Sequence, residues 1–307
     1  MKLVSFGPRG GEEPGVLADE ETIVPLRPLL TEHGLAGIGM PALLALFPTL
    51  RKHIEKVLAE PSETLPLART RIGPPVPRPG SVYAVGANYP LHVAELAGSD
   101  RRERPNRPVL FAKTVSSING PNDAIVKPVE TQALDYEIEL AVVIGDGGRR
   151  ITRDDAMDHV AGYMIANDVT ARDVFLGESK KNPLHLQTLC GKGYDTFCPT
   201  GPWLVTADDI PDYRDLRMRL WVNQELRQDA TPGGMSFDIP DLIAAASSCF
   251  TLRPGDVLLT GTPAGVGVGL EPPQFLTAGD ELRLEISGLG EMRTRIVGER
   301  SEADTGL

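Results

Sequence analysis

Short runs of apolar and alternating residues, separated by Gly and Pro, recur along most of the chain and predict β-strands. The expected strands lie at 81–85, 109–113, 136–144, 162–168, 203–206, 218–222, 257–260, 281–286 and 293–297. Turn residues within 222–226 and 286–290 predict antiparallel hairpins. Helical patterns are fewer, chiefly at 90–98 and 239–249. The sequence therefore predicts an α+β fold that is mainly β, with mixed strand pairing.

The first part of the chain has a different pattern. Short strands are expected at 2–6 and within 15–24, and apolar residues at helical spacing predict a helix at 41–59. The segment that follows is rich in Pro and Gly and cannot extend a helix or a central strand. The predicted organisation is a small N-terminal α+β domain at 1–72, a linker at 73–80, a larger domain at 81–300 and a tail at 301–307.

Charge narrows the classes of partner. The chain has 31 basic and 42 acidic residues, a net charge of −11, which argues against nucleic acid or an anionic membrane as partner. No apolar stretch reaches the roughly 18 residues that span a bilayer, and no signal peptide is apparent. Three cysteines without a CxxC pair suit a reducing compartment, so a cytoplasmic location is expected.

Acidic residues interrupt one of the most apolar strand patterns. Asp135, Glu137 and Glu139 alternate just before an apolar run, so in a strand their side chains share one face. Two like charges about 4 Å apart repel by roughly 4 kcal/mol at an effective dielectric constant near 20. Such a face is either solvated or holds a cation, and this segment alone leaves both interpretations open.

A second acidic segment favours the cation. The apolar run at 162–168 ends in Asp168, and an acid at a strand end facing a strand with paired acids can form an all-oxygen site. Carboxylates without Cys or His favour Mg²⁺ or Mn²⁺, with Ca²⁺ as a further candidate and Zn²⁺ disfavoured. Three protein ligands would leave positions open for water and a chelating substrate.

Several segments together resemble one family. In chain order they are 85–95, 108–113, 135–145, 167–173, 191–202 and 259–267. Over 82–297 the chain resembles the fumarylacetoacetate hydrolase family and is identified as a bacterial member with an N-terminal extension domain. The resemblance implies a mixed β-roll, a homodimer, and Glu137, Glu139 and Asp168 as metal ligands with Asp135 as a neighbour.

His92 and Glu95 lie three residues apart and would share one face of a helical turn. A carboxylate bound to one imidazole nitrogen strengthens the other nitrogen as a base. By itself the pair is commonplace on helix surfaces. The resemblance implies that it lies on a lid and activates a water molecule, with Lys192 holding a substrate oxygen. It also implies a set of substrate-binding residues, which comprises Asn88, Tyr89, Lys113, Arg172 and Thr262.

One position departs from the family pattern. Many members carry glutamine three residues after the arginine of the 167–173 block, and this chain has Phe175 there. An aromatic ring removes both a donor and an acceptor from the pocket wall. We expect either a less polar substrate tail or a different reaction.

The leading hypothesis is a metal-dependent hydrolase that cleaves a C–C bond in a 2,4-dioxo acid of the acylpyruvate or fumarylpyruvate type. Oxaloacetate decarboxylation and isomerisation or tautomerisation of a 2-hydroxydienoate use the same enolate and remain alternatives. A metal-free binding protein on an enzyme scaffold is a third class. A serine or cysteine hydrolase is disfavoured, because the sequence has no Gly-x-Ser-x-Gly elbow and its cysteines lack activating neighbours.

Overall fold

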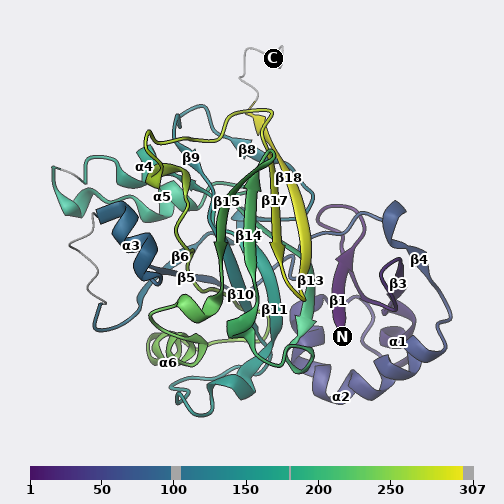
Figure 1. The fold of residues 1–307 in the computed structure, drawn as a ribbon. Coiled ribbons are helices and arrows are strands. Elements are labelled where there is room, and N and C mark those ends of the chain that lie inside the picture. Colours follow the sequence, from purple (N-terminus) through teal and green to yellow (C-terminus); the bar gives the residue numbers. More distant parts are fainter. Residues whose placement is uncertain (98–104, 180, 300–307) are drawn as a thin grey trace.

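The computed structural model describes residues 1–97, 105–179 and 181–299. Within these ranges the fold is mainly β, with helices at its periphery (Figure 1). No helix in the described ranges combines the length and the apolar character needed to cross a bilayer. The predicted tail at 301–307 lies outside the described residues, as does the last position of the helix predicted at 90–98.

The largest sheet has eleven strands and runs through the whole fold. From one edge to the other, its order is β4 (Leu65–Pro66), β3 (Thr22–Pro25), β2 (Glu13–Leu17), β1 (Lys2–Phe6), β13 (Cys198–Thr206), β11 (Val160–Asn167), β10 (Ile138–Ile144), β16 (Val257–Leu259), β5 (Val82–Gly86) and β6 (Val109–Lys113). The eleventh strand, β7 (Ile118–Asn119), pairs with β13 in parallel. Parallel pairing also joins β16 to β5, so the sheet is mixed, as predicted.

A second sheet has five strands and contains both predicted hairpins. Its order is β15 (Glu225–Ala230), β14 (Met218–Val222), β17 (Glu281–Ile286), β18 (Gly290–Gly298) and β8 (Ile125–Lys127). The hairpins close where Val222 pairs with Glu225 and where Ile286 pairs with Gly290. A third, two-stranded sheet joins β9 (Leu134–Asp135) to β12 (Thr170–Ala171).

Helices lie around the sheets. The α-helices are α1 (Arg27–Glu32), α2 (Met40–Ala59), α3 (Pro90–Ala97), α4 (Arg172–Leu176), α5 (Thr188–Lys192) and α6 (Ile239–Cys249). Single 3₁₀ turns occupy Leu67–Arg69, Val115–Ser117, Ala156–His159, Pro183–His185, Ala207–Asp209, Tyr213–Asp215, Pro232–Gly234 and Gly267–Gly269. Helix α6 has its predicted bounds. Its start is fixed by a capping box between Asp238 and Asp241.

The N-terminal strands continue the large sheet. Strand β1 pairs with β13, with Leu3 opposite Leu204, and one hydrophobic cluster contains Leu3 and Leu43 together with Ala141 and Met164. The first part of the chain therefore shares a core with the rest of the fold, and its elements lie beside β13 in Figure 1. The predicted domain boundaries stay a prediction.

Strand β10 lies between β11 and β16 and is buried along its whole length. The strand predicted at 136–144 begins at Ile138 in the structure. Tyr136 and Glu137 form a break between β9 and β10. Side chains replace the missing ladder partners there, since the backbone N–H groups of Glu137 and Ile138 donate to side-chain oxygens elsewhere in the fold. This break is where the acidic residues meet.

Candidate metal site and active-site cavity

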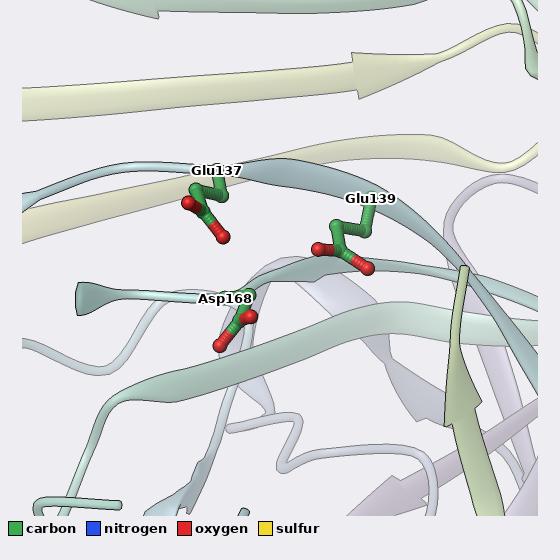
Figure 2. Close-up of side chains that lie close together, drawn as sticks. All are labelled: Glu137, Glu139 and Asp168. Carbon is green, nitrogen blue, oxygen red and sulfur yellow. The ribbon is translucent and has the colours of Figure 1, made fainter. Parts of the chain in front are cut away.

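Three carboxylates come together next to the start of β10. Each of Glu137, Glu139 and Asp168 offers an oxygen within 4.8 Å of the others, and all three side chains are buried. Figure 2 shows that Glu137 and Glu139 project from one segment toward Asp168 on another. The two segments are paired strands, because Glu139 lies opposite Ala166 in the β10–β11 ladder.

Backbone contacts fix the positions of these carboxylates. The backbone N–H of Asp168 donates to the carbonyl oxygen of Glu137 (2.9 Å), and the N–H of Glu137 donates to Asn167 Oδ1 (2.9 Å). The N–H of Ile138 donates to Gln228 Oε1 (3.0 Å). Each strand end is therefore tied to its neighbour, and the carboxylates are pre-organised to face one another.

Buried cations surround two of the three carboxylates. Lys192 Nζ donates to Glu137 Oε2 (2.7 Å) and Asp168 Oδ2 (2.6 Å). Lys113 Nζ donates to Asp168 Oδ1 (2.6 Å). Arg172 Nη2 donates to Glu137 Oε1 (2.6 Å). Close, hydrogen-bonded pairs of this kind offset the large cost of removing each charge from water.

These neighbours give the carboxylates different pKa values. Burial by itself raises the pKa of Glu137, but the charges of Lys192 and Arg172 outweigh it and hold the pKa below its usual range. Burial raises the pKa of Glu139 well above its usual range, and the negative charges of Asp168 and Glu137 add to the rise. For Lys192, burial lowers the pKa, yet Asp168 and Glu137 bring it above its ordinary value.

Asp135 lies beside the cluster and outside the group that could hold an ion. Its carboxylate accepts from Arg172 Nε (2.8 Å) and from the backbone N–H groups of Gly267 (2.7 Å) and Val268 (3.1 Å). It therefore braces Arg172 and the glycine-rich loop. This matches the neighbour role that the resemblance implies for it.

The donor set fits a hard divalent cation. Among the described residues, Glu139 has no cationic partner, and one of its oxygens accepts from the backbone N–H of Gly261 (2.6 Å). With Asp135 included, four buried carboxylates face three buried cations, so the ionised cluster keeps one negative charge. A divalent ion beside Glu139 would give a cationic partner to the one carboxylate of the cluster that lacks one, and an all-carboxylate donor set suits Mg²⁺ or Mn²⁺.

The predicted acid–base pair is formed. His92 Nδ1 lies 2.7 Å from Glu95 Oε1 on helix α3, and Glu95 Oε2 accepts from the backbone N–H of Gly265 (2.9 Å). Gly269 leaves the room that Glu95 needs, since a Cβ there would lie 2.6 Å from Glu95 Oε2. The glutamate is thus held between the helix and the glycine-rich loop, and it orients the imidazole.

His92 and the three carboxylates line one cavity of about 260 Å³, and Glu95 contacts His92 from outside that lining. Its polar lining consists of His92, Glu137, Glu139, Asp168, Arg172, Thr188, Lys192 and Thr262. Thr262 Oγ1 donates to the carbonyl oxygen of Ile138 (2.9 Å) and accepts from Gln228 Nε2 (2.8 Å). The structure thus brings all the predicted catalytic and metal-binding residues to one place.

Three predicted substrate-binding residues lie behind the cavity wall. Asn88 is buried and bonds with the backbone of Phe237 and Thr260. The Tyr89 hydroxyl points to Met218 Sδ (3.7 Å). The Lys113 side chain is fully buried and bonds with Asp168 and the carbonyl oxygens of Val169 and Lys192. Their polar groups are engaged by the protein and none of the three lines this cavity, so their substrate-binding role stays a prediction.

Two residues that hold the backbone of the site in place were not predicted from the sequence. Gln228 is fully buried and connects β15 to the start of β10 and to the carbonyl oxygen of Pro263. Asn167 precedes Asp168 and positions Glu137. A buried glutamine in an otherwise exposed, charged strand is invisible to a hydrophobicity pattern. The Asn-Asp dipeptide at a strand end was the available signal for Asn167.

None of the three cysteines lines this cavity. Cys190, Cys198 and Cys249 are free, and Cys198 is buried. Burial raises the pKa of the Cys198 thiol to about 12, so it is protonated at neutral pH.

Comparisons with known proteins identify the family of this chain. A family model described as fumarylacetoacetate (FAA) hydrolase C-terminal matches residues 81–297. Oxaloacetate tautomerase FAHD2B, mitochondrial, of Bos taurus is 42% identical over 275 residues, which cover 85% of either chain.

Solved structures are also similar over nearly the full length. A probable 2-hydroxyhepta-2,4-diene-1,7-dioate isomerase from Mycobacterium abscessus has 39% identity and a TM-score of 0.80, covering 98% of this chain and 100% of that one. Maleylpyruvate hydrolase from Sphingobium sp. SYK-6, in complex with manganese(II) and pyruvate, has 33% identity and a TM-score of 0.79 with the same coverage. The chain belongs to the fumarylacetoacetate hydrolase family.

Proposed function

We propose that this chain is a divalent-metal-dependent enzyme that forms the enolate of a 2-oxo acid, and that it hydrolyses a C–C bond in a 2,4-dioxo acid. The observation that carries the proposal is the single cavity lined by His92, which is paired with Glu95, and by the three carboxylates. A base and an electrophilic centre beside the same substrate are what enolate chemistry requires.

Glu137, Glu139 and Asp168 would hold Mg²⁺ or Mn²⁺. The ion would act as a Lewis acid that polarises the 2-oxo group and stabilises the negative charge developing there. Support comes from the donor set and from the manganese(II) and pyruvate in the similar maleylpyruvate hydrolase structure. Lys192 keeps a positive charge beside the same carboxylates.

In the proposed reaction, His92 removes a proton from water, and the resulting hydroxide attacks the C4 carbonyl of the dioxo acid. The C3–C4 bond then breaks, and its electron pair moves to C3 to give the enolate of pyruvate. His92 returns the proton that it took from water to C3, which yields pyruvate, while C4 leaves as a carboxylic acid that carries the oxygen of water. Glu95 keeps one imidazole nitrogen engaged, which leaves Nε2 for proton transfer.

Tautomerisation of oxaloacetate is the second candidate, favoured by the 42% identical oxaloacetate tautomerase. In this reaction the dyad would move one proton between C3 and the 2-oxygen, and no bond between carbon atoms breaks. The cluster and the dyad would have the same roles in forming the enolate. Decarboxylation of oxaloacetate is a third outcome of the same intermediate.

A substrate panel separates these reactions. Purified protein with Mn²⁺ or Mg²⁺ is given acetylpyruvate and oxaloacetate, and pyruvate release and enol–keto absorbance are followed. Hydrolysis predicts pyruvate and acetate in equal amounts, with kcat lowered about 10²- to 10⁴-fold in His92→Gln. Enol–keto exchange without pyruvate release assigns the tautomerase. Absence of every reaction with either metal refutes the proposal.

Two predictions from the sequence complete the proposal. A homodimer is expected from the resemblance to the family, and a cytoplasmic location from the cysteine usage. Light scattering after size-exclusion chromatography tests the first, and fractionation of the source cells tests the second.

A further inference from the structure

The cavity has an apolar wall as well as a polar one. Large hydrophobic side chains from α3, β6, α4 and the segment before α5 line it, namely Leu96, Val109, Phe111, Phe175 and Leu186. These residues are far apart in the sequence, and they line the same cavity as the carboxylate cluster. The polar wall accounts for the 2-oxo acid end of a substrate and leaves this wall without a role.

Much of this apolar surface faces solvent. Leu96 is 47% exposed, Val109 is 50% exposed and Leu186 is 43% exposed. Single exposed hydrophobic residues are ordinary on a surface, but several around one concave site mark a place where an apolar group binds. Burying them against a ligand removes apolar area from water and is therefore favourable.

Phe175 is held at the cavity by a close contact between helices. Gly191 of α5 lies against Phe175 of α4, and a Cβ at Gly191 would lie 2.4 Å from Phe175 Cβ. The backbone N–H of Gln187 also donates to the carbonyl oxygen of Phe175 (2.9 Å). The ring centroid lies 5.9 Å from Lys192 Nζ, so the apolar wall begins directly beside the charged cluster.

The cations of the lining are already paired. Arg172 binds Asp135 and Glu137, and Lys192 binds Glu137 and Asp168. His92 is paired with Glu95. These cations all belong to the polar wall beside the carboxylate cluster, and the described side chains of the apolar wall carry no charge that could pair with a second carboxylate on the substrate. A charged tail would lose hydration without gaining a partner.

We propose that this site selects 2-oxo or 2,4-dioxo acids whose tail is uncharged and apolar, such as an alkyl or aryl group, and that Phe175 determines this preference. The inference rests on the proposed function, because it assumes that the 2-oxo acid end lies at the carboxylate cluster. It adds the chemical class of the tail, which the reaction itself does not specify.

Calorimetry with substrate-like 2-oxo acids tests the inference without turnover. The Mn²⁺-saturated protein is titrated with oxalate, 2-oxobutanoate, 2-oxohexanoate and 2-oxoadipate. Each buried CH₂ group is expected to tighten binding roughly fourfold, so 2-oxohexanoate should bind about fifteenfold tighter than 2-oxobutanoate. The 2-oxoadipate anion, with the same number of carbon atoms, should bind at least about tenfold more weakly than 2-oxohexanoate.

Other outcomes are distinguishable. Equal affinities along the series, or tighter binding of 2-oxoadipate, overturn the inference while oxalate binding leaves the proposed function standing. Failure of every compound to bind, oxalate included, refutes both.

With affinities expressed relative to oxalate, Phe175→Gln should lose most of the preference for 2-oxohexanoate and Phe175→Leu should keep it. An unchanged preference in Phe175→Gln removes Phe175 as its determinant.

Discussion

Glu137 and Glu139 are two residues apart, yet their surroundings differ. Glu137 accepts from Arg172 and Lys192, whereas Glu139 accepts from the backbone N–H of Gly261. A carboxylate with two charged donors is held rigidly, and one without a cationic partner is available to an ion. The cluster therefore contains a carboxylate fixed by cations, Glu137, and a carboxylate whose oxygens are available to an ion, Glu139.

Arg172 contributes to this rigidity. It joins two carboxylates through separate nitrogens, Nε to Asp135 and Nη2 to Glu137, and a lysine cannot reproduce both bonds. Arg172→Lys is expected to weaken Mn²⁺ binding about 10- to 100-fold, as measured by calorimetry. Unchanged Mn²⁺ affinity with a raised KM would instead support the substrate-binding role predicted from the sequence.

At the scale of elements, two short helices supply part of the site. Helices α4 and α5 are only one turn or so long, and isolated helices of this length are unstable. Their close contact at Gly191, where any Cβ would meet the Phe175 backbone, compensates for this. The same contact places Phe175 and Lys192 at the cavity.

Gly191→Ala tests this contact. The added methyl group would lie 2.5 Å from Phe175 Cα and 2.7 Å from its nitrogen, so backbone must move and the expected loss of stability is about 1–3 kcal/mol. Urea unfolding measures it. Gly298→Ala is the control, because its nearest neighbour would be Ala278 Cβ at 3.9 Å. Equal stability of the two variants would show that α4 and α5 separate easily.

At the scale of the whole molecule, one sheet unites the chain. Strand β1 pairs with β13, which in turn pairs with β11, so the strand that precedes Asp168 lies two positions from the N-terminal strand. Movement of the proposed metal ligands is therefore opposed by the packing of the entire sheet. An ion bound by the cluster should stabilise the molecule as a whole.

Thermal unfolding with and without metal measures this effect. Mn²⁺ at about 100 times its Kd should add about 2.7 kcal/mol to the free energy of unfolding, and excess chelator should abolish the gain. Glu139→Gln is expected to lose the response to Mn²⁺. Glu20→Gln removes an exposed carboxylate between β2 and β3, far in sequence from the cluster, and this variant should retain the response to Mn²⁺. A similar response in both variants would place the ion elsewhere.

The sequence alone predicted the class of fold, most strands and the metal-ligand candidates. These features are encoded locally, because alternation of apolar residues, turn residues and an acid at a strand end need no distant partner. The hairpins closed by Glu225 and Gly290 and the His92–Glu95 pair are of this kind. Family motifs then added the expectation that separate acidic segments form one site.

Only the tertiary structure decided which side chains reach the cavity. Lys113 donates to Asp168, 55 residues away, and Gln228 supports Ile138 across 90 residues. Such contacts depend on how strands pair and how helices pack, and nothing in the local pattern distinguishes a lysine that touches substrate from one behind the wall. The apolar wall arose in the same way, since its residues meet only after the helices have packed on the sheet.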